Sequence, residues 1–425
     1  MRVAAAWGSF LLASVSPAAV VAQESEALGG PGNGAADDTA DGTADPAVAL
    51  PAPAPVAAQG QKAPDIEFAW TQFLGTSIRE NVDDRWRYGG RVDIYARVTG
   101  STLGLDDSIT VNIHPELRYG QGINGEIGVL PVQTGLFYPT DDGTESDLSL
   151  SVKKTWKSGT SLEVGKVNVL DIAAGLPVVG GGGIEGFENL AFALPPSTIV
   201  PQSMLGAMLT VPTKKALFRL WVFDPVIQTQ ETGFESPFST GVGALASVTF
   251  PVKLGGKPGY YAIKLSGTTR KGPPVEVLPA GLRPIPGGSF GNARGQASVV
   301  FAAYQYLGLY KDAPGKGWGA FGQVFFSDGD PTPLDVSGIF GVSGDVPFRP
   351  QDHFGLGWFR YSLADKLVND LAPFVGFEDE EGAEAFYTFQ VAKPLRITAD
   401  VQYIDSTVTA RKPGWAVGLR AVTRF

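Results

Sequence analysis

Two segments of the chain carry acidic, basic and aromatic side chains at every second position. They comprise Arg91, Asp93, Tyr95 and Arg97, and then Thr110, Asn112, His114, Glu116 and Arg118. Carboxylates and guanidinium groups can bridge neighbouring hydroxyls of a ligand, and a tyrosine ring can stack on the apolar face of a sugar-like ring. A pathway for ions would instead carry a block of one sign. The interleaved pattern therefore favours weak binding of a neutral, polyhydroxylated solute, with generic polar lining of a water-filled space as the alternative.

Motifs for catalysis and metal binding are missing or lack the context that they need. The chain has no Cys and only two His, which excludes thiol chemistry, Cys-based zinc sites and His clusters. Residues 287–291 match the G-x-S-x-G pattern, but the Pro- and Gly-rich residues before them cannot form the buried strand that a nucleophile elbow requires. The glycine run 180–183 lacks the Gly-Lys-Ser/Thr of a phosphate loop, and the acidic run 378–381 is expected to be a solvated loop rather than a calcium site. We predict no catalytic residue, no metal site and no cofactor, in a protein that is not an enzyme.

The polar rows belong to segments with a two-residue hydrophobic period. At 415–425 the odd positions are Trp, Val, Leu, Ala, Thr and Phe, and Arg420 is on the other face. At 395–403 the odd positions are again apolar, and Arg396 and Asp400 are on the other face. This alternation is typical of strands with one apolar and one polar side. We therefore add Arg396, Asp400 and Arg420 to the candidate solute path.

Three features of the segment 415–425 indicate that its apolar side faces lipid. Its ten steps span about 33 Å at about 3.3 Å per residue, and a tilt of about 40° reduces this to roughly the 25 Å of an outer-membrane apolar band. Trp415 and Phe425 are at its two ends, as expected for aromatic girdles. A last amphipathic strand ending in Phe is also typical of substrates of the outer-membrane barrel assembly machinery, so we expect Trp415 and Phe425 to form the assembly signal. A soluble β-protein would share only the alternation.

Composition and length agree with a large antiparallel barrel. Gly (55) and Pro (32) are abundant and only 18% of residues are charged, which favours strands joined by turns over helices. The longest uncharged run, 189–213, contains four prolines and cannot form a membrane-spanning helix. We predict an all-β fold, a transmembrane antiparallel β-barrel of about 16 strands (16–18), which encloses an aqueous channel. Short turns are expected at 157–160 and 392–394, and long, extracellular loops near 172–203, 271–296, 327–352 and 362–383.

Two N-terminal segments are expected to lie outside the barrel, which leaves residues 65–425 for it. Residues 1–22 combine a positive start, an apolar stretch and a Val-Val-Ala cleavage site, as in a signal peptide, with an uncleaved anchor as the alternative. Residues 23–64 are rich in Ala, Pro, Gly and acidic residues and contain no aromatic residue, so we expect a disordered acidic segment. The net charge of −10 argues against a nucleic-acid partner.

Several segments, in their order and spacing, resemble the OprB-type carbohydrate-selective porins of Gram-negative outer membranes. They are Tyr-Gly-Gly-Arg-Val-Asp-Ile-Tyr at 88–95, Leu-Gly-Leu at 103–105, Phe-Glu-Asn-Leu-Ala-Phe at 187–192, Gly-Leu-Gly-Trp at 355–358, Glu-Ala-Phe-Tyr at 384–387 and Thr-Ala-Asp-Val-Gln at 398–402. The Trp-Gly-Gly-x-Arg-type opening that is usual in this family is not recognisable at 65–80, so the N-terminal part is expected to differ.

The resemblance implies a 16-stranded outer-membrane barrel that passes carbohydrates, chiefly monosaccharides such as glucose, into the periplasm by energy-independent facilitated diffusion. The implied partners are carbohydrate solutes, outer-membrane lipids and lipopolysaccharide, and the barrel assembly machinery. The sequence leaves open whether the protein is a monomer or a homotrimer. A general or anion-preferring diffusion porin is the first alternative, and a non-conducting barrel such as an adhesin is the second.

Overall fold

The computed structural model describes residues 18–19, 64–80, 82, 84–130, 143–180, 183–193, 196–197, 200–225, 234, 236–272, 293–328, 334–373 and 375–425. The predicted signal peptide (1–22) and the predicted acidic segment (23–64) therefore lie outside the described residues, except for three positions, and both stay predictions. The G-x-S-x-G pattern at 287–291 also lies outside them.

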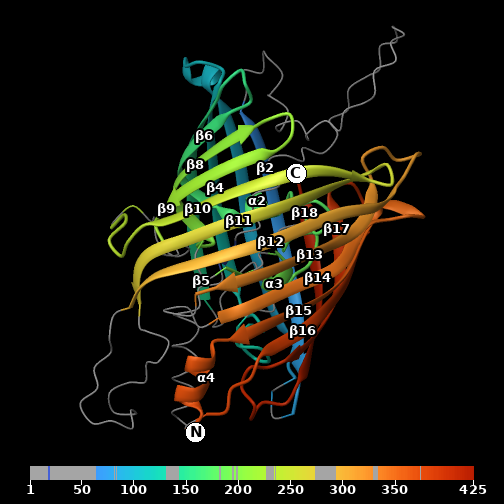
Figure 1. Cartoon of the computed structure of the whole chain (residues 1–425). Coiled ribbons are helices and arrows are strands. Elements are labelled where there is room, and N and C mark those ends of the chain that lie inside the picture. The colour runs from blue at the N-terminus through green and yellow to red at the C-terminus, as the bar shows by residue number, and fades with distance from the viewer. Residues whose placement is uncertain are drawn as a thin grey trace.

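Within the described residues, sixteen strands form one closed antiparallel barrel (Figure 1). Successive barrel strands are paired, and the last strand pairs with the first to close the ring. The strands are β2 (Asp65–Ile78), β3 (Arg87–Thr99), β4 (Ile109–Gly120), β5 (Gly143–Thr155), β6 (Ser161–Asn168), β8 (Ser203–Pro212), β9 (Leu217–Phe223), β10 (Gly243–Leu254), β11 (Lys257–Gly272), β12 (Ala293–Leu309), β13 (Gly317–Ser327), β14 (Leu334–Val346), β15 (Arg349–Leu363), β16 (Glu380–Gln390), β17 (Leu395–Asp405) and β18 (Gly414–Arg424). The predicted all-β barrel of about 16 strands is confirmed.

The remaining described elements are short. They are the 3₁₀ turn η3 (Gly100–Leu103) and the helices α2 (Val169–Ala173), α3 (Leu190–Ala193) and α4 (Asp365–Leu371), together with the two-residue strands β1 (Ala18–Ala19) and β7 (Pro196–Ser197), which pair with each other. None of the helices in the described ranges has the length and apolar character needed to cross a membrane.

The two faces of the strands differ as the alternation predicts. On β18, the outward side chains Trp415 and Leu419 are 49% and 47% exposed, whereas Arg420 is completely buried. On β3 and β4, Ile94 and Leu117 are exposed while their polar neighbours are buried. Large exposed apolar side chains recur on most strands of the barrel, which is the arrangement that a lipid-facing surface requires.

The two rims of the barrel carry connections of unequal length. One rim has short turns such as 156–160, 391–394 and Gly255-Gly256, where positive φ angles of 56° and 77° allow a two-residue turn between β10 and β11. The other rim has the longer connections 121–142, 169–202, 224–242, 273–292 and 364–379. The predicted turns at 157–160 and 392–394 are therefore confirmed.

The long loop predicted at 327–352 is wrong, because β14 and β15 occupy most of that range. Glycine in this stretch serves packing instead of loop formation. A Cβ at Gly341 would lie 2.7 Å from the ring of Phe321, so only glycine leaves room for that ring against the inner wall.

The acidic run 378–381 is also not a solvated loop throughout. Glu380 begins β16 and is completely buried. Its carboxylate accepts the backbone N–H groups of Val129 (2.7 Å), Leu130 (2.9 Å) and Thr407 (3.1 Å). Glu380 therefore ties the connection after β4 to the connection after β17 at the long-loop rim.

Candidate functional site

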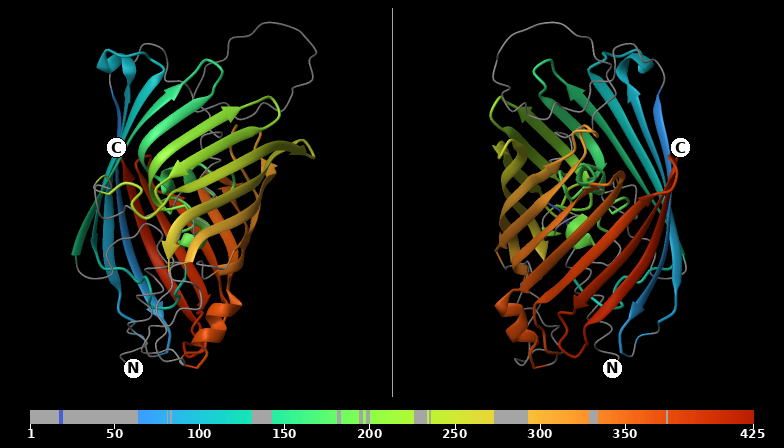
Figure 2. Two further views of the ribbon diagram at one scale, coloured as in Figure 1. Left: turned by 60° about the vertical axis from the view of Figure 1, so that its left-hand side comes forward. Right: turned by 90° about the vertical axis from the view of Figure 1, so that its right-hand side faces the viewer.

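Between β6 and β8, the described residues 169–180 and 183–193 turn into the barrel and cross its lumen. Both views of Figure 2 place its short helices within the ring of strands. Arg420, on the far wall, donates from Nη2 to the carbonyl oxygen of Gly186 (2.6 Å), and Thr388 of β16 donates to the carbonyl oxygen of Glu185 (3.3 Å). We call residues 169–202 the lumen loop, because any solute that passes through the barrel must pass beside it.

Two asparagines explain why the chain turns inward at α2 and at α3. Asn168 ends β6, and its Oδ1 accepts the backbone N–H two residues further on (3.0 Å), which caps α2. Its Nδ2 donates to Glu116 on the β4 wall (2.9 Å). Asn189 repeats this arrangement at α3, where Oδ1 accepts a backbone N–H (2.8 Å) and Nδ2 donates to Gln402 of β17 (2.9 Å). Each asparagine therefore starts a helical turn and binds that turn to the barrel wall.

An aromatic cluster holds the middle of the lumen loop against β13, β15 and β16. The rings of Phe187 and Phe192 are 4.5 Å apart, and Phe187 is 4.9 Å from Phe386. The wall beneath them is flat, because a Cβ at Gly355 would lie 2.7 Å from Phe187 and a Cβ at Gly357 would lie 2.5 Å from Phe192. Burial of each phenylalanine contributes roughly 1.5–3 kcal/mol. The Gly-x-Gly pattern of β15 therefore forms a seat for two aromatic side chains of the loop.

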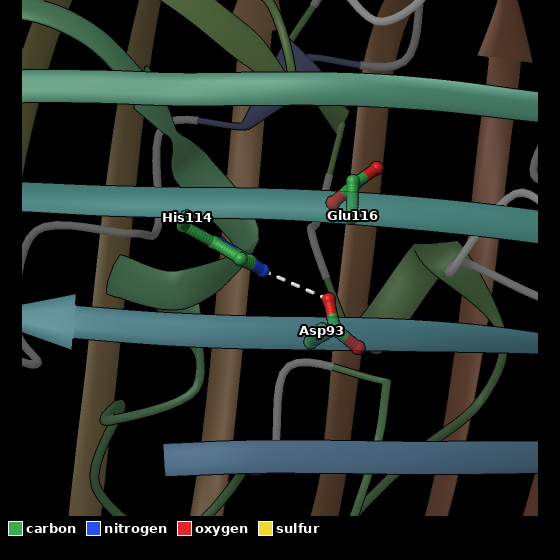
Figure 3. Close-up of side chains that lie close together, drawn as sticks. All are labelled: Asp93, His114 and Glu116. Atoms are coloured by element: carbon green, nitrogen blue, oxygen red, sulfur yellow. Dashed lines mark hydrogen bonds and ion pairs between the residues drawn. The ribbon is translucent and has the colours of Figure 1, made fainter. Parts of the chain in front are cut away.

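A network of paired charges holds the start of the lumen loop against β3 and β4, and Figure 3 shows three of its side chains, Asp93, His114 and Glu116. Nη2 of Arg91 lies 2.6 Å from Asp93 Oδ1 and 3.0 Å from Glu116 Oε2. His114 bridges two carboxylates, with Nε2 2.8 Å from Asp93 Oδ1 and Nδ1 2.6 Å from Oδ2 of Asp171 in α2. We call these five residues the wall network. Only Asp171 in this network keeps substantial exposure, 34% of its side chain.

The wall network includes three groups whose ligand atoms lie within 4.8 Å of one another, Asp93, His114 and Glu116. Their chemistry could suit a metal ion, but Arg91 already binds both carboxylates. Both nitrogens of His114 face carboxylate oxygens, which is the geometry of a ring that donates twice. A cation would have to displace the guanidinium group, so the arrangement fits a structural network of ion pairs better than a metal site.

A second group of charges remains in part accessible on β2, β17 and β18, beside the wall network. Glu185 binds Arg396 of β17 and Arg424 of β18, the latter with a 2.8 Å contact from Nε. Arg424 also binds Glu67 of β2. About a quarter to a half of each of these four side chains is exposed. We call Glu67, Glu185, Arg396 and Arg424 the exposed cluster. The ring of Tyr95 lies 4.2 Å from that of His114, and Tyr95 is paired with Glu67 across the neighbouring strands, so it lies between the two groups of charges.

The residues predicted to line the solute path fall into two classes. Those that are buried are Arg91, Asp93, His114, Glu116, Arg118, Asp400 and Arg420. Tyr95 and Arg396 are partly accessible, and Arg97 is exposed. All share the inward side of their strands, but the first class is packed against neighbouring wall groups or the lumen loop. Contact with a solute stays a prediction for both classes, and the geometry favours the second. Trp415 and Phe425 are exposed on the barrel, and their role in assembly also stays a prediction.

Four accessible charges were absent from the predicted path. Asp171 and Glu185 belong to the lumen loop, where no periodicity in the sequence indicates which side chains meet the wall. Glu67 and Arg424 lie on strands and share the inward side with predicted residues, so the alternation could have identified them.

A small cleft lies under α2 at the base of β6, β8 and β9. Its lining combines Glu163, Arg219 and Trp221 with Ile172 and Met208. These side chains are nearly all buried, and the free space suffices for about one water molecule. The cleft therefore cannot hold a hexose in this conformation, and it is not the solute path.

A closed barrel with an apolar outer face, a polar inner face and a loop folded into its lumen defines the protein as a porin. The sequence matches the family described as carbohydrate-selective porin, OprB family, over residues 84–425, so the chain belongs to that family. The resemblance in the segments between 88 and 402 is thereby confirmed.

Solved structures with the same fold include a high-pH structure of OprB from Pseudomonas putida. It has a TM-score of 0.72 and 18% identity, over 86% of this chain and 94% of that chain. The outer-membrane channel DcaP of Acinetobacter baumannii is also similar, with a TM-score of 0.52 and 10% identity over 86% of this chain and 99% of that chain. At these identities the likeness is one of fold alone. A comparison with curated proteins gives no match.

Proposed function

We propose that the protein is an outer-membrane channel through which neutral carbohydrates, monosaccharides such as glucose, diffuse passively into the periplasm. The observation that carries this proposal is the pairing of the accessible lumen charges. Glu185 is shared by Arg396 and Arg424, and Arg424 also binds Glu67. Acids and bases alternate at the passage, as suits a solute without net charge.

The chemistry of the passage suits hydroxyl groups. Carboxylates of Asp171 and Glu185 can accept hydrogen bonds from sugar hydroxyls, and the guanidinium groups of Arg396 and Arg424 can donate them. Tyr95 adds an aromatic side chain between the wall network and Glu67 of the exposed cluster. Transport requires that binding stay weak, on the order of a millimolar Kd or about −4 kcal/mol.

A general or anion-preferring porin is the alternative, and the exposed cluster argues against anion preference. Both arginines of the cluster are neutralised by carboxylates, so neither presents an uncompensated positive charge. An enzymatic role is also disfavoured. The groups best suited to acid–base chemistry, His114 and Asp93, are buried and engaged with Arg91 and Asp171.

The proposal includes the surroundings of the barrel. The exposed apolar surface fits outer-membrane lipids, with lipopolysaccharide at the long-loop rim, and assembly by the barrel assembly machinery follows from that location. Whether the barrel works alone or as a homotrimer is a separate question, which cross-linking in membranes can answer.

Liposome swelling with the refolded protein tests the proposal. The solutes are glucose, a disaccharide and a neutral amino acid of similar size to glucose. We expect glucose to cross faster than the amino acid. Rates that depend on size alone would identify a general porin instead, and no swelling from a folded, heat-modifiable protein would contradict a channel function altogether.

A further inference from the structure

Among the described residues, Glu384 of the barrel wall binds the lumen loop directly through its carboxylate, beside Asp400 of β17. Glu384 of β16 is 1% exposed, and it accepts the backbone N–H groups of Glu188 (2.5 Å) and Asn189 (2.9 Å). A buried carboxylate is costly unless hydrogen-bond donors surround it. Here the loop supplies two such donors immediately before α3. The loop and Glu384 therefore stabilise each other.

Other wall groups fix the same stretch of the loop from the next strands. Arg420 of β18 donates to the carbonyl oxygens of Gly183 (2.5 Å) and Gly186 (2.6 Å). Gln402 of β17 accepts from Asn189 (2.9 Å). Acceptors and donors of three adjacent strands thus bind backbone groups and one side chain of residues 183–189. Backbone contacts of this kind define the position of the chain itself, not only of its side chains.

The apolar contacts fix the same stretch of the loop. Phe187 lies between the two backbone contacts to Arg420 and Glu384, and its ring is seated on Gly355. Charge-assisted hydrogen bonds on both sides of a seated ring restrict this segment strongly. This describes a fixed bar across the lumen and not a mobile gate.

We propose that Glu384 is a positioning residue that fixes residues 183–193 across the lumen and thereby sets the largest carbohydrate that the channel passes. This inference rests on the proposed function and specifies its size limit. Because Glu384 is buried beneath the loop, it acts through the position of the loop and not through contact with a solute.

Glu384→Gln is the variant that tests this role. Glutamine keeps the size of the side chain but replaces one acceptor oxygen with an NH₂ group, which faces a backbone N–H as a second donor. Glu381→Gln is the matched control, because Glu381 lies on the same strand, is 42% exposed and contacts Arg360 (3.8 Å) outside the lumen. Both variants are compared with the wild type in planar-bilayer conductance and in liposome swelling with glucose, a disaccharide and a trisaccharide.

We expect Glu384→Gln to raise single-channel conductance about twofold or more, and to admit a trisaccharide at about a tenth or more of the glucose rate when the wild type excludes it. Glu381→Gln should match the wild type. Unchanged conductance and size limit in a folded, heat-modifiable Glu384→Gln protein would overturn the inference. If that variant does not fold, Glu384→Asp, which withdraws the carboxylate by one CH₂ from the backbone N–H groups of Glu188 and Asn189, decides by the same two measurements.

The outcomes separate this inference from the proposed function. Wild-type channels that swell liposomes but show no preference for glucose over the amino acid would contradict the proposed sugar preference, and the size measurement would still stand. If the wild type prefers sugars but the size limit is unchanged in the folded Glu384 variants, only the role of Glu384 is contradicted.

Discussion

At the scale of single residues, the inner surface shows that a charged side chain in a porin lumen need not meet solute. Arg91, Asp93 and Glu116 are all nearly inaccessible, yet each has a partner of opposite charge within 3.0 Å. Such a network contributes little to the free energy of unfolding compared with an apolar core of the same size. The loss of one member, however, leaves a buried charge without compensation. Its function in this channel is therefore to hold the wall and the start of the lumen loop in one arrangement.

The substitution Arg91→Met tests this account of the wall network. It leaves Asp93 without a guanidinium partner and Glu116 with only the longer contact to Arg118 (3.4 Å), and we expect the free energy of unfolding to fall by about 3–5 kcal/mol. Urea unfolding in lipid vesicles, followed by tryptophan fluorescence, measures this loss. Arg360→Met is the control, since Arg360 is half exposed and its pair with Asp379 should contribute only about 0–1 kcal/mol. Equal losses for the two variants would contradict the network.

At the scale of elements, the two-residue period of the sequence predicted the barrel and several of its strands with their inward rows, but it missed β14 and the start of β15, which were predicted as a loop. The two-residue period could not predict the course of the lumen loop. Glu188 and Glu384, which meet through a hydrogen bond, are 196 residues apart, and neither lies in a pattern that points to the other. The role of the Gly-x-Gly in β15 could not be predicted from its neighbours in the sequence either. The two glycines make room for Phe187 and Phe192, which are distant in the chain.

The seat on β15 yields a prediction for the whole loop. Gly357→Ala places a methyl group about 2.5 Å from the ring of Phe192, so the ring must move and take the loop with it. We expect a loss of about 1–3 kcal/mol in unfolding free energy from overpacking, together with an altered single-channel conductance. Gly338→Ala on β14 is a suitable control, because its added carbon would have its nearest neighbour at 3.6 Å. A folded Gly357→Ala protein with wild-type conductance would show that the loop does not depend on this seat.

At the scale of the molecule, the paired charges predict how the channel treats ions. Carboxylates and guanidinium groups occur together in the exposed cluster and in the wall network, so the lumen should not favour one sign strongly. We expect the ratio of potassium to chloride permeability to lie within about threefold of one. The zero-current potential across a bilayer under a KCl gradient measures this ratio. A strong preference for chloride would instead support an anion-preferring porin.

The unequal rims of the barrel predict its orientation in the outer membrane. Outer-membrane barrels place short turns in the periplasm and longer connections outside the cell. Because the chain has no cysteine, an introduced one can be labelled without background. Asn369 lies on α4 at the long-loop rim, and Lys157 lies in the short turn 156–160 at the other rim. Both side chains are exposed, so we choose Asn369→Cys and Lys157→Cys. We expect a membrane-impermeant maleimide to label the first variant in intact cells, and the second only after the outer membrane is permeabilised. Labelling of Lys157→Cys in intact cells would show the opposite orientation. The exposed cluster, which joins the start of β2 to the end of β18, would then lie toward the outer mouth of the channel and not toward its periplasmic exit.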